Sequence, residues 1–498
     1  MNTNTLTNNN LTFTFDNLVY SFRPANLNDP THLKCVLSVT NKNGYTYLDK
    51  LDLYSAGSRR VLVKKSVSRV ESSAQTLDHD LTKIIKELEK TRDASDGGRD
   101  TAVDIPPNLK AEAINYLKHP DLVNNIITSF HKMGFVGEDL NLLTAYLVAI
   151  SRKLRHPLSL MIMSRSGAGK STLQDALLKF TPEEEYQLYT RLTDQVLYYK
   201  DTNELTHKLI AIEEIQGAKG ASYSLRNLLT SHGLSVNSAI KDPLTGQLKA
   251  MSHKVKGPVA LILTTTCIDD IDYELLTRFI IITVDESKEQ TQKILSKQRQ
   301  ARSLEGIISR RNNEHEQILH QNMQRLLKPI EIVNPYHDKL KFDHNNLIMR
   351  RRHLHYLGII EAVTLLHQHQ RQIKTAKDSI GTEFEYIEVT KRDIEIANKI
   401  AEKVLPNSGD ELLPPARNLH KEIVRMNEGN GTHPFYRRDI RKYTGWNDYQ
   451  IRTYLRQLID LEYIGVASGG GKGNTCEYTI LYNGNGNKPT ELIDTNLL

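Results

Sequence analysis

Residues 157–178 contain the feature that most constrains this chain: a short apolar run, a glycine-rich loop and an amphipathic stretch. The apolar run, 158–163, has the length of a buried strand. The loop at 164–171 reads SRSGAGKS, which is the phosphate-binding pattern except that Ser164 stands where glycine is usual. Backbone N–H groups of such a loop, at the positive end of a helix, cradle a polyphosphate. A chance glycine-rich turn is the alternative, and the flanking strand and helix favour the nucleotide site.

The loop also predicts which groups a nucleotide would meet. Lys170 is expected to reach the β- and γ-phosphates, and the hydroxyl of Ser171 is expected to bind Mg²⁺. The predicted cofactors are therefore ATP and Mg²⁺. The residues predicted to bind ATP are Ser164, Arg165, Ser166, Gly167, Ala168, Gly169, Lys170, Ser171 and Thr172.

Composition sets the broad class of the protein. The 498 residues are 39% hydrophobic and 25% charged, which is typical of a globular chain with several domains. Apolar runs are too short for a membrane span, and the N-terminus lacks a signal-peptide pattern. The three cysteines lie far apart, which excludes a CxxC zinc site and fits a reducing compartment: Cys35, Cys267 and Cys476. We therefore expect a cytoplasmic protein without a membrane partner, and the net charge of +6 permits a nucleic-acid partner without requiring one.

Two further buried-strand runs end in polar residues. Residues 209–212 end in Glu213-Glu214, where catalysis needs one carboxylate to hold Mg²⁺ and another to deprotonate the attacking water. The usual order is Asp-Glu, so Glu214 is the better candidate for the base and Glu213 is the candidate for the metal. The run at 259–263 ends in three threonines. This resembles AAA+ ATPases, whose polar residue here, sensor 1, bonds the water or γ-phosphate, and Thr265 is the first candidate.

Arginines with catalytic roles are predicted at two places. The segment 272–279, DYELLTRF, resembles the AAA+ helix that places an arginine finger in the neighbouring subunit's site. Arg278 would then stabilise transition-state charge in trans, and an ordinary surface arginine is the alternative. Another arginine could reach the nucleotide from a lid as sensor 2. The candidates for that role are Arg350, Arg351 and Arg352.

An insertion separates the acidic pair from the threonines. Residues 235–240 and 247–255 alternate like two strands, and 241–246 form a turn. This resembles the β-hairpin of superfamily 3 and minichromosome maintenance helicases, which projects into a hexamer's channel and grips DNA. An exposed hairpin with solubilising lysines is the alternative. The candidate DNA contacts are Lys241, Lys249, His253 and Lys254.

The C-terminal region predicts a winged helix. Its helices are expected at 419–426, 437–443 and 448–461, and its strands at 464–467 and 476–482. In a winged helix the third helix enters the major groove and the wing touches the backbone. A winged helix that docks protein is the alternative. The candidate DNA contacts are Gln450, Arg452, Thr453, Arg456 and Lys472. A basic cluster at 151–156 is either a solvated helix end or a further DNA contact.

The remaining sequence patterns predict where the domains of the chain begin and end. Residues 12–55 alternate in strand fashion, 77–88 have helical apolar spacing, and 92–107 are polar with Gly and Pro. The predicted organisation is an N-terminal α+β module (1–95), a linker (96–107), a helical lead-in (108–156), the P-loop core (157–290), a helical lid (291–407), a linker (408–415), a winged helix (416–485) and a tail (486–498).

Short segments along nearly the whole chain carry a family resemblance. They are 51–55, 136–138, 151–154, 166–171, 221–223, 241–243, 263–266, 285–287, 289–291, 333–336 and 386–390. The chain resembles the C-terminal, ATPase half of bacterial zinc-finger/Toprim DNA primase proteins, found largely on mobile elements. It has no zinc-finger cysteine set and no acidic Toprim core. The resemblance therefore implies that primer synthesis would come from a separate chain.

Together these patterns predict an α/β chain with an AAA+ P-loop core, an inserted hairpin, a helical lid and a winged helix. The expected function is that of an ATP-dependent DNA helicase or translocase, a homo-oligomeric ring with a hexamer favoured, replicating a mobile or viral-like element. Single-stranded DNA would pass through the channel and duplex DNA would bind the winged helix. The alternatives are an ATPase that loads or regulates another DNA machine, and a nucleotide-gated DNA-binding regulator.

Overall fold

The computed structural model describes residues 2–7, 10–15, 17–24, 33–96, 103–190, 192, 196–213, 219–241, 248–266, 271–342, 348–405, 412–428, 434–469 and 476–482. The chain forms two compact units, Met1–Asp104 and Ile105–Leu498. None of the helices in the described ranges has both the length and the apolar character that crossing a membrane requires.

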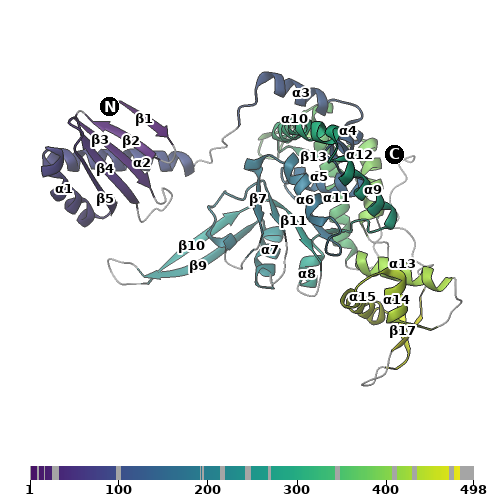
Figure 1. Ribbon diagram of the computed structural model, residues 1–498. Coiled ribbons are helices and arrows are strands. Elements are labelled where there is room, and N and C mark those ends of the chain that lie inside the picture. Colours follow the sequence, from purple (N-terminus) through teal and green to yellow (C-terminus); the bar gives the residue numbers. More distant parts are fainter. Residues whose placement is uncertain are drawn as a thin grey trace. The chain divides into compact units, whose positions relative to one another are not determined.

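The N-terminal unit is an antiparallel sheet covered by two helices (Figure 1). Its elements are β1 (Asn2–Thr7), β2 (Asn10–Phe15), β3 (Leu18–Pro24), β4 (Lys34–Asn41), β5 (Thr46–Asp52), α1 (Ala56–Val70) and α2 (Ala74–Asp96). Alternate side chains of β3 and β4 are buried because one face of each strand packs on the helices. The hydroxyl of Tyr20 donates to Asp80 Oδ2 at 2.9 Å, which fixes α2 to the sheet.

A five-stranded parallel sheet forms the centre of the second unit, in the order β12-β6-β11-β8-β7. Its strands are β6 (Ser159–Met163), β7 (Tyr186–Tyr189), β8 (Lys208–Ile212), β11 (Val259–Thr265) and β12 (Ile280–Ile282). Every residue of β6 and β11 is buried, as expected for parallel strands covered on both faces. Because the strands are parallel, the loops after β6, β8 and β11 meet at one edge of the sheet. The short strand β7 is not among the sequence predictions.

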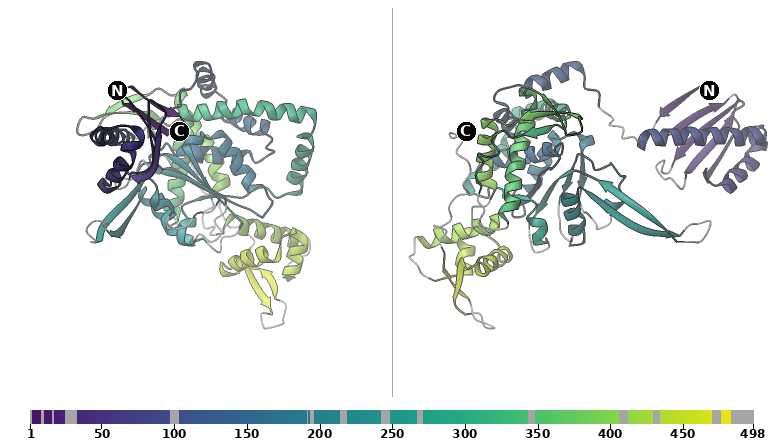
Figure 2. Two further views of the ribbon diagram at one scale, coloured as in Figure 1. Left: turned by 60° about the vertical axis from the view of Figure 1, so that its left-hand side comes forward. Right: turned by 180° about the vertical axis from the view of Figure 1, so that it is seen from behind.

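Helices cover both faces of this sheet (Figures 1 and 2). Leu160 and Ile162 of β6 face one core, which includes α3 (Pro107–Leu117), α4 (Leu122–Lys132), α5 (Asp139–Ser151), α6 (Lys170–Phe180), α10 (Leu304–Leu326), α11 (Met349–Leu366) and α12 (Lys391–Val404). Met161 and Met163 face the other core, which includes α7 (Lys219–Ser231) and α8 (Tyr273–Leu276). The same region also contains α9 (Lys288–Gln300), η1 (Glu183–Glu185), η2 (Val196–Tyr199) and η3 (Gln368–Gln370).

The predicted insertion is a long antiparallel hairpin, β9 (Gly233–Lys241) and β10 (Leu248–Lys256), which extends from the core in Figure 1. Pairing is continuous from Gly233 opposite Lys256 to Lys241 opposite Leu248. Leu234 and Val255 are buried at its base and join the core beneath α7. The base of the hairpin is therefore packed on the parallel sheet, while the turn at 242–247 lies outside the described residues.

The region predicted as a helical lid, 291–407, is not helical throughout. This region contains a three-stranded sheet in the order β13-β15-β14, with strands β13 (Glu331–Val333), β14 (Lys374–Lys377) and β15 (Glu383–Glu388). The strands are short and mostly exposed, so they lack the apolar alternation that marks a half-buried strand. Only Ile387 of β15 is buried among the described strand residues of this sheet.

The C-terminal segment packs three helices against a small antiparallel sheet of order β16-β18-β17. Its elements are α13 (Pro414–Glu428), β16 (Phe435–Tyr436), α14 (Arg437–Thr444), α15 (Asp448–Asp460), β17 (Ile464–Ser468) and β18 (Glu477–Ile480). Gly445, with a φ of 69°, ends α14 in the left-handed conformation. Asn447 then caps α15 by accepting the N–H of Gln450 at 2.9 Å.

Arg152 and Lys153 of the basic cluster at 151–156 are buried, so both alternatives predicted for the cluster are wrong for these two residues, while Arg155 and His156 are exposed. The side chain of Arg152 has no exposed surface and pairs with Glu185, which also accepts from Lys153 Nζ at 3.2 Å. Burial acts to raise the pKa of Glu185, but the charges of Arg152 and Lys153 lower it overall. Arg152 is therefore a structural cation that fastens α5 to η1.

Replacing Arg152 with alanine should lower the free energy of unfolding by about 3 kcal/mol or more, because breaking a buried pair leaves a poorly solvated charge. Denaturant titration of the full chain, followed by circular dichroism, measures this. The matched control is Arg155→Ala, since Arg155 is exposed in the same cluster and its loss should cost about 0.5 kcal/mol or less. Equal effects of the two substitutions would contradict the structural role of Arg152.

Candidate nucleotide-binding site

The loop between β6 and α6 has the backbone that a phosphate cradle needs. Gly167 and Gly169 have φ values of 79° and 102°, in the left-handed region that glycine adopts without strain. Helix α6 begins at Lys170, so the loop lies at the positive end of the helix. Ser171 and Thr172 of the first turn are exposed and accessible to a ligand.

Ser164 can replace the usual first glycine because of its backbone conformation and the hydrogen bonds of its hydroxyl. Its backbone is not in the positive-φ region, so the freedom of glycine is not needed there. Its hydroxyl donates to the carbonyl of Met163 at 2.6 Å and accepts the N–H of Val284 at 2.8 Å. The serine therefore ties the start of the loop to the segment that follows β12.

Lys170 and Arg165 are both held by groups of this chain. Lys170 Nζ donates to the carbonyls of Ser164 at 2.9 Å and Arg165 at 2.8 Å. The N–H of Arg165 donates to Glu286 Oε1 at 2.8 Å, and its guanidinium pairs with the same carboxylate. Phosphate oxygens form stronger, charge-assisted bonds than neutral carbonyls. A polyphosphate in the loop could therefore draw Lys170 away from its carbonyl partners.

The end of the threonine strand lies between the loop and the acidic strand end, because β11 separates β6 from β8. Glu213, just after β8, donates its N–H to Tyr189 O at 3.0 Å, and its carbonyl accepts from the hydroxyl of Thr264. Thr265, which follows Thr264 in the chain, is also buried. Glu214, the predicted base, lies outside the described residues. The arrangement brings polar groups from three strand ends to one edge of the sheet.

A second segment, 136–138, borders the site, although no motif in the sequence predicts a role for it. Glu138 accepts from the N–H of Asp285 and from the amide of Asn141, and Gln290 donates to the carbonyl of Val136. Burial raises the pKa of Glu138, although these hydrogen bonds act against the rise. In the sequence, these residues stood out only as parts of the segments that carry the family resemblance, 136–138, 285–287 and 289–291.

A cavity of about 710 Å³ lies beside the loop. Ser164 and Arg165 line one side, the segment 283–289 lines another, and residues of α13, α14 and α15 line a third. Gln450 lines this cavity and is only 7% exposed, so the expectation that it reaches DNA bases is corrected. Gln450 was predicted as a DNA contact from its place on the third helix, but its side chain borders a cavity that it shares with Ser164 and Arg165.

Arg278 lies on the surface formed by α7 and α8. Its side chain donates to Thr230 Oγ1 at 2.9 Å and pairs with Glu274 Oε1 at 3.0 Å. The arginines at 350–352 do not line the 710 Å³ cavity. Arg351 instead contacts Thr277 and Glu274, and Arg352 is buried beside β12. The structure thus brings Arg351 and Arg278 to the same glutamate.

The other DNA-contact candidates are described in part. Arg452 and Arg456 are exposed on α15, and Thr453 is half-buried; Arg452 pairs with Asp448 at 2.9 Å. Lys254 is exposed near the base of the hairpin. Lys472 lies outside the described residues, as do the side chains of three hairpin candidates, Lys241, Lys249 and His253.

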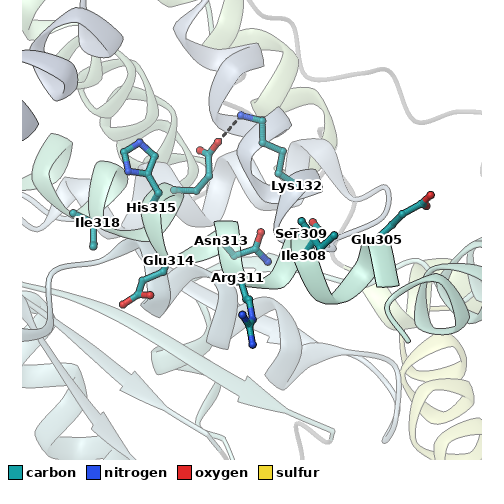
Figure 3. A pocket seen from close by; sticks show the side chains of 10 residues that line it. Lys132, Glu305, Ile308, Ser309, Arg311, Asn313, Glu314, His315 and Ile318 are labelled. Atoms are coloured by element: carbon teal, nitrogen blue, oxygen red, sulfur yellow. Dashed lines mark hydrogen bonds and ion pairs between the residues drawn. The ribbon is translucent and has the colours of Figure 1, made fainter. Parts of the chain in front are cut away.

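A second hollow of about 980 Å³ lies away from the loop, between Lys132 and the outer face of α10 (Figure 3). The dashed line in Figure 3 marks the ion pair between Lys132 and Glu316. No residue of the phosphate-binding loop lines this hollow. Within the described part of the chain, no group of three His, Cys, Asp or Glu residues is placed to hold a metal ion. We therefore place the candidate site at the loop after β6 despite the larger volume of this hollow.

Comparison with known proteins supports the assignment of the core. Residues 107–329 match the model of a family described as the MTBMA_p00010 P-loop domain. A search of curated proteins returned no match. The matched segment contains the parallel sheet, the glycine loop and the hairpin, and it ends before α11. The core is thus a P-loop domain of the nucleoside-triphosphatase type, and P-loop sites usually bind the nucleotide together with Mg²⁺.

Proposed function

We propose that this chain is an ATP-dependent DNA helicase or translocase of the AAA+ type. The single observation that carries the proposal is the position of the hairpin. Helix α7 leads directly into β9, and β10 leads through Gly257-Pro258 into β11, which ends in the threonines. A change at the nucleotide edge of the sheet would therefore be passed to the hairpin through covalent neighbours at both ends.

The strand order supports the AAA+ assignment. One strand, β11, separates the loop strand β6 from the acidic strand β8, and its threonine end is where a sensor 1 residue would meet the γ-phosphate or water. In the proposed mechanism Lys170 would hold the phosphates, Ser171 and Glu213 would hold Mg²⁺, and Glu214 would take a proton from the attacking water. A homo-hexameric ring would place Arg278 at the neighbouring subunit's nucleotide. The sensor 2 candidates remain Arg350, Arg351 and Arg352, and Arg351 is bound to the same glutamate as Arg278.

The C-terminal segment is proposed to bind duplex DNA as a winged helix. Three helices and a three-stranded antiparallel sheet are the parts of that fold, and α15 presents Arg452 and Arg456 to solvent. Exposed arginines on such a helix can contact phosphates. The wider role would be replication of a mobile or viral-like element, with primer synthesis supplied by another chain. The alternatives remain an ATPase that loads another DNA machine and a nucleotide-gated regulator.

The hairpin gives the test of this function. A hairpin that grips a phosphate backbone needs lysines, so Lys241→Ala combined with Lys249→Ala should leave basal ATPase activity and assembly intact. DNA stimulation of ATPase activity and strand displacement should both fall, by about tenfold or more if each contact contributes about 1 kcal/mol.

The matched control is Lys256→Ala, which removes an exposed lysine at the base of the same hairpin. It should behave like the unmodified chain. Full strand displacement by the double variant would contradict the channel role of the hairpin. If the double variant loses DNA stimulation but the unmodified chain does not unwind DNA either, the result would favour an ATPase that loads another DNA machine.

A further inference from the structure

The buried amide of Gln450 is the starting observation. Its backbone N–H caps α15 through Asn447, but its side-chain Oε1 has no hydrogen-bond partner in the described structure. Leaving a buried acceptor unpaired costs about 1–3 kcal/mol. Gln450 also lines the 710 Å³ cavity, and a small movement of its side chain would expose the buried Oε1 to a ligand there, which could supply the missing donor.

Aromatic side chains stand beside Gln450 in the same cavity. Trp446, Tyr443 and Tyr454 line it, and Trp446 packs edge-to-face on Tyr454 with ring centroids 6.0 Å apart. The guanidinium of Arg165 lies 5.7 Å from the centre of the Trp446 ring. The P-loop and the C-terminal segment therefore meet in this cavity through a cation–π contact.

The cavity has the size and chemistry for one part of a bound nucleotide. Its volume is within the range of small-molecule sites, and it begins at the first two residues of the phosphate-binding loop. The wall carries acidic and basic side chains in equal number, and Glu286 is already paired with Arg165, so the lining has no excess of positive charge for further phosphate groups. An uncharged, flat group with hydrogen-bond donors fits the aromatic side chains and the free acceptor better.

We propose that this cavity holds the base of the bound nucleoside triphosphate, and that Gln450 Oε1 accepts a hydrogen bond from the exocyclic amino group of adenine. This inference rests on the P-loop part of the proposed function and extends it to base selectivity. The C-terminal segment then forms part of the nucleotide site. Occupancy of the site would alter the environment of Trp446, which is the only tryptophan in the chain.

Titration of the full chain with ATP or ITP, followed by Trp446 emission, tests this directly. ITP carries a carbonyl oxygen where ATP carries the amino group, so it would face Gln450 acceptor to acceptor. The unmodified chain should bind ATP at least about tenfold more tightly than ITP, the ratio expected for one unmatched buried acceptor. Gln450→Met, which keeps the side-chain volume, should bring the two affinities together. Gln457→Met on the same helix, with the half-buried Gln457 outside the cavity, should keep the preference.

The outcomes separate the two proposals. Equal binding of ATP and ITP by the unmodified chain, or tighter binding of ITP, would overturn the base site and leave the P-loop assignment standing. A preference for ATP that survives in Gln450→Met would also overturn it. Absence of any nucleotide binding by the unmodified chain, measured by equilibrium dialysis, would overturn both proposals.

Discussion

Lys170→Ala is expected to abolish ATP binding and, with it, ATP hydrolysis. Lys170 is the buried cation of the loop, and its ammonium would exchange the carbonyls of Ser164 and Arg165 for phosphate oxygens. Losing this charge removes contacts to the bound ground state, so affinity itself should fall. Loss of one such preorganised donor lowers turnover by about 10²-fold or more. Equilibrium dialysis with ATP and a phosphate-release assay measure the two effects.

Glu214→Gln should separate binding from chemistry. Removing a general base affects the transition state and leaves ground-state contacts in place, so ATP should bind while turnover falls about 10²-fold or more. Lys179→Ala is the matched control for Lys170, because Lys179 is an exposed lysine on the same helix. Normal turnover in Glu214→Gln would move the base elsewhere, with Glu213 as the next candidate.

Arg278→Ala is expected to lower turnover by on the order of 10³ or more while leaving ATP binding intact, because an arginine finger acts on transition-state charge. In the isolated chain Arg278 is held by Glu274 and Thr230, and only 14% of its side chain is exposed. Assembly would have to turn its guanidinium toward the neighbouring nucleotide. The control is Arg299→Ala, which removes an exposed arginine from α9.

Mixing subunits tests whether Arg278 acts in trans. Arg278→Ala and Lys170→Ala chains are each inactive in this account, but a mixed ring would contain junctions where an intact loop meets an intact arginine. ATPase activity should therefore recover at intermediate ratios. If mixed rings assemble and no ratio restores activity, Arg278 does not act across the interface, and its contacts with Glu274 would be purely structural.

The sequence predicted the parts whose patterns are local. The apolar run before the loop, Gly167 and Gly169 in the turn, and alternation along 235–255 each arise from the backbone geometry of one element. These features are visible without knowing what packs against them. The parallel sheet edge could likewise be expected, since polar residues follow two separate buried runs.

Features that depend on distant packing could not be predicted in this way. Arg152 is an ordinary basic residue in sequence, and its burial depends on Glu185 in a different element. Gln450 lies on a helix with exposed arginines, yet it is buried and borders a cavity shared with the phosphate-binding loop. The exposed strands β13 to β15 carry no alternation because few of their side chains face a core.

The most direct test of the central claim is strand displacement from forked duplex DNA by the purified full chain, with Mg²⁺ and either ATP or a non-hydrolysable analogue. A hydrolysis-driven motor should separate the strands only with ATP, its ATPase activity should rise with DNA, and the Lys170→Ala chain should do neither. An ATPase that hydrolyses ATP at the same rate with and without DNA, and leaves the fork intact, would contradict the account.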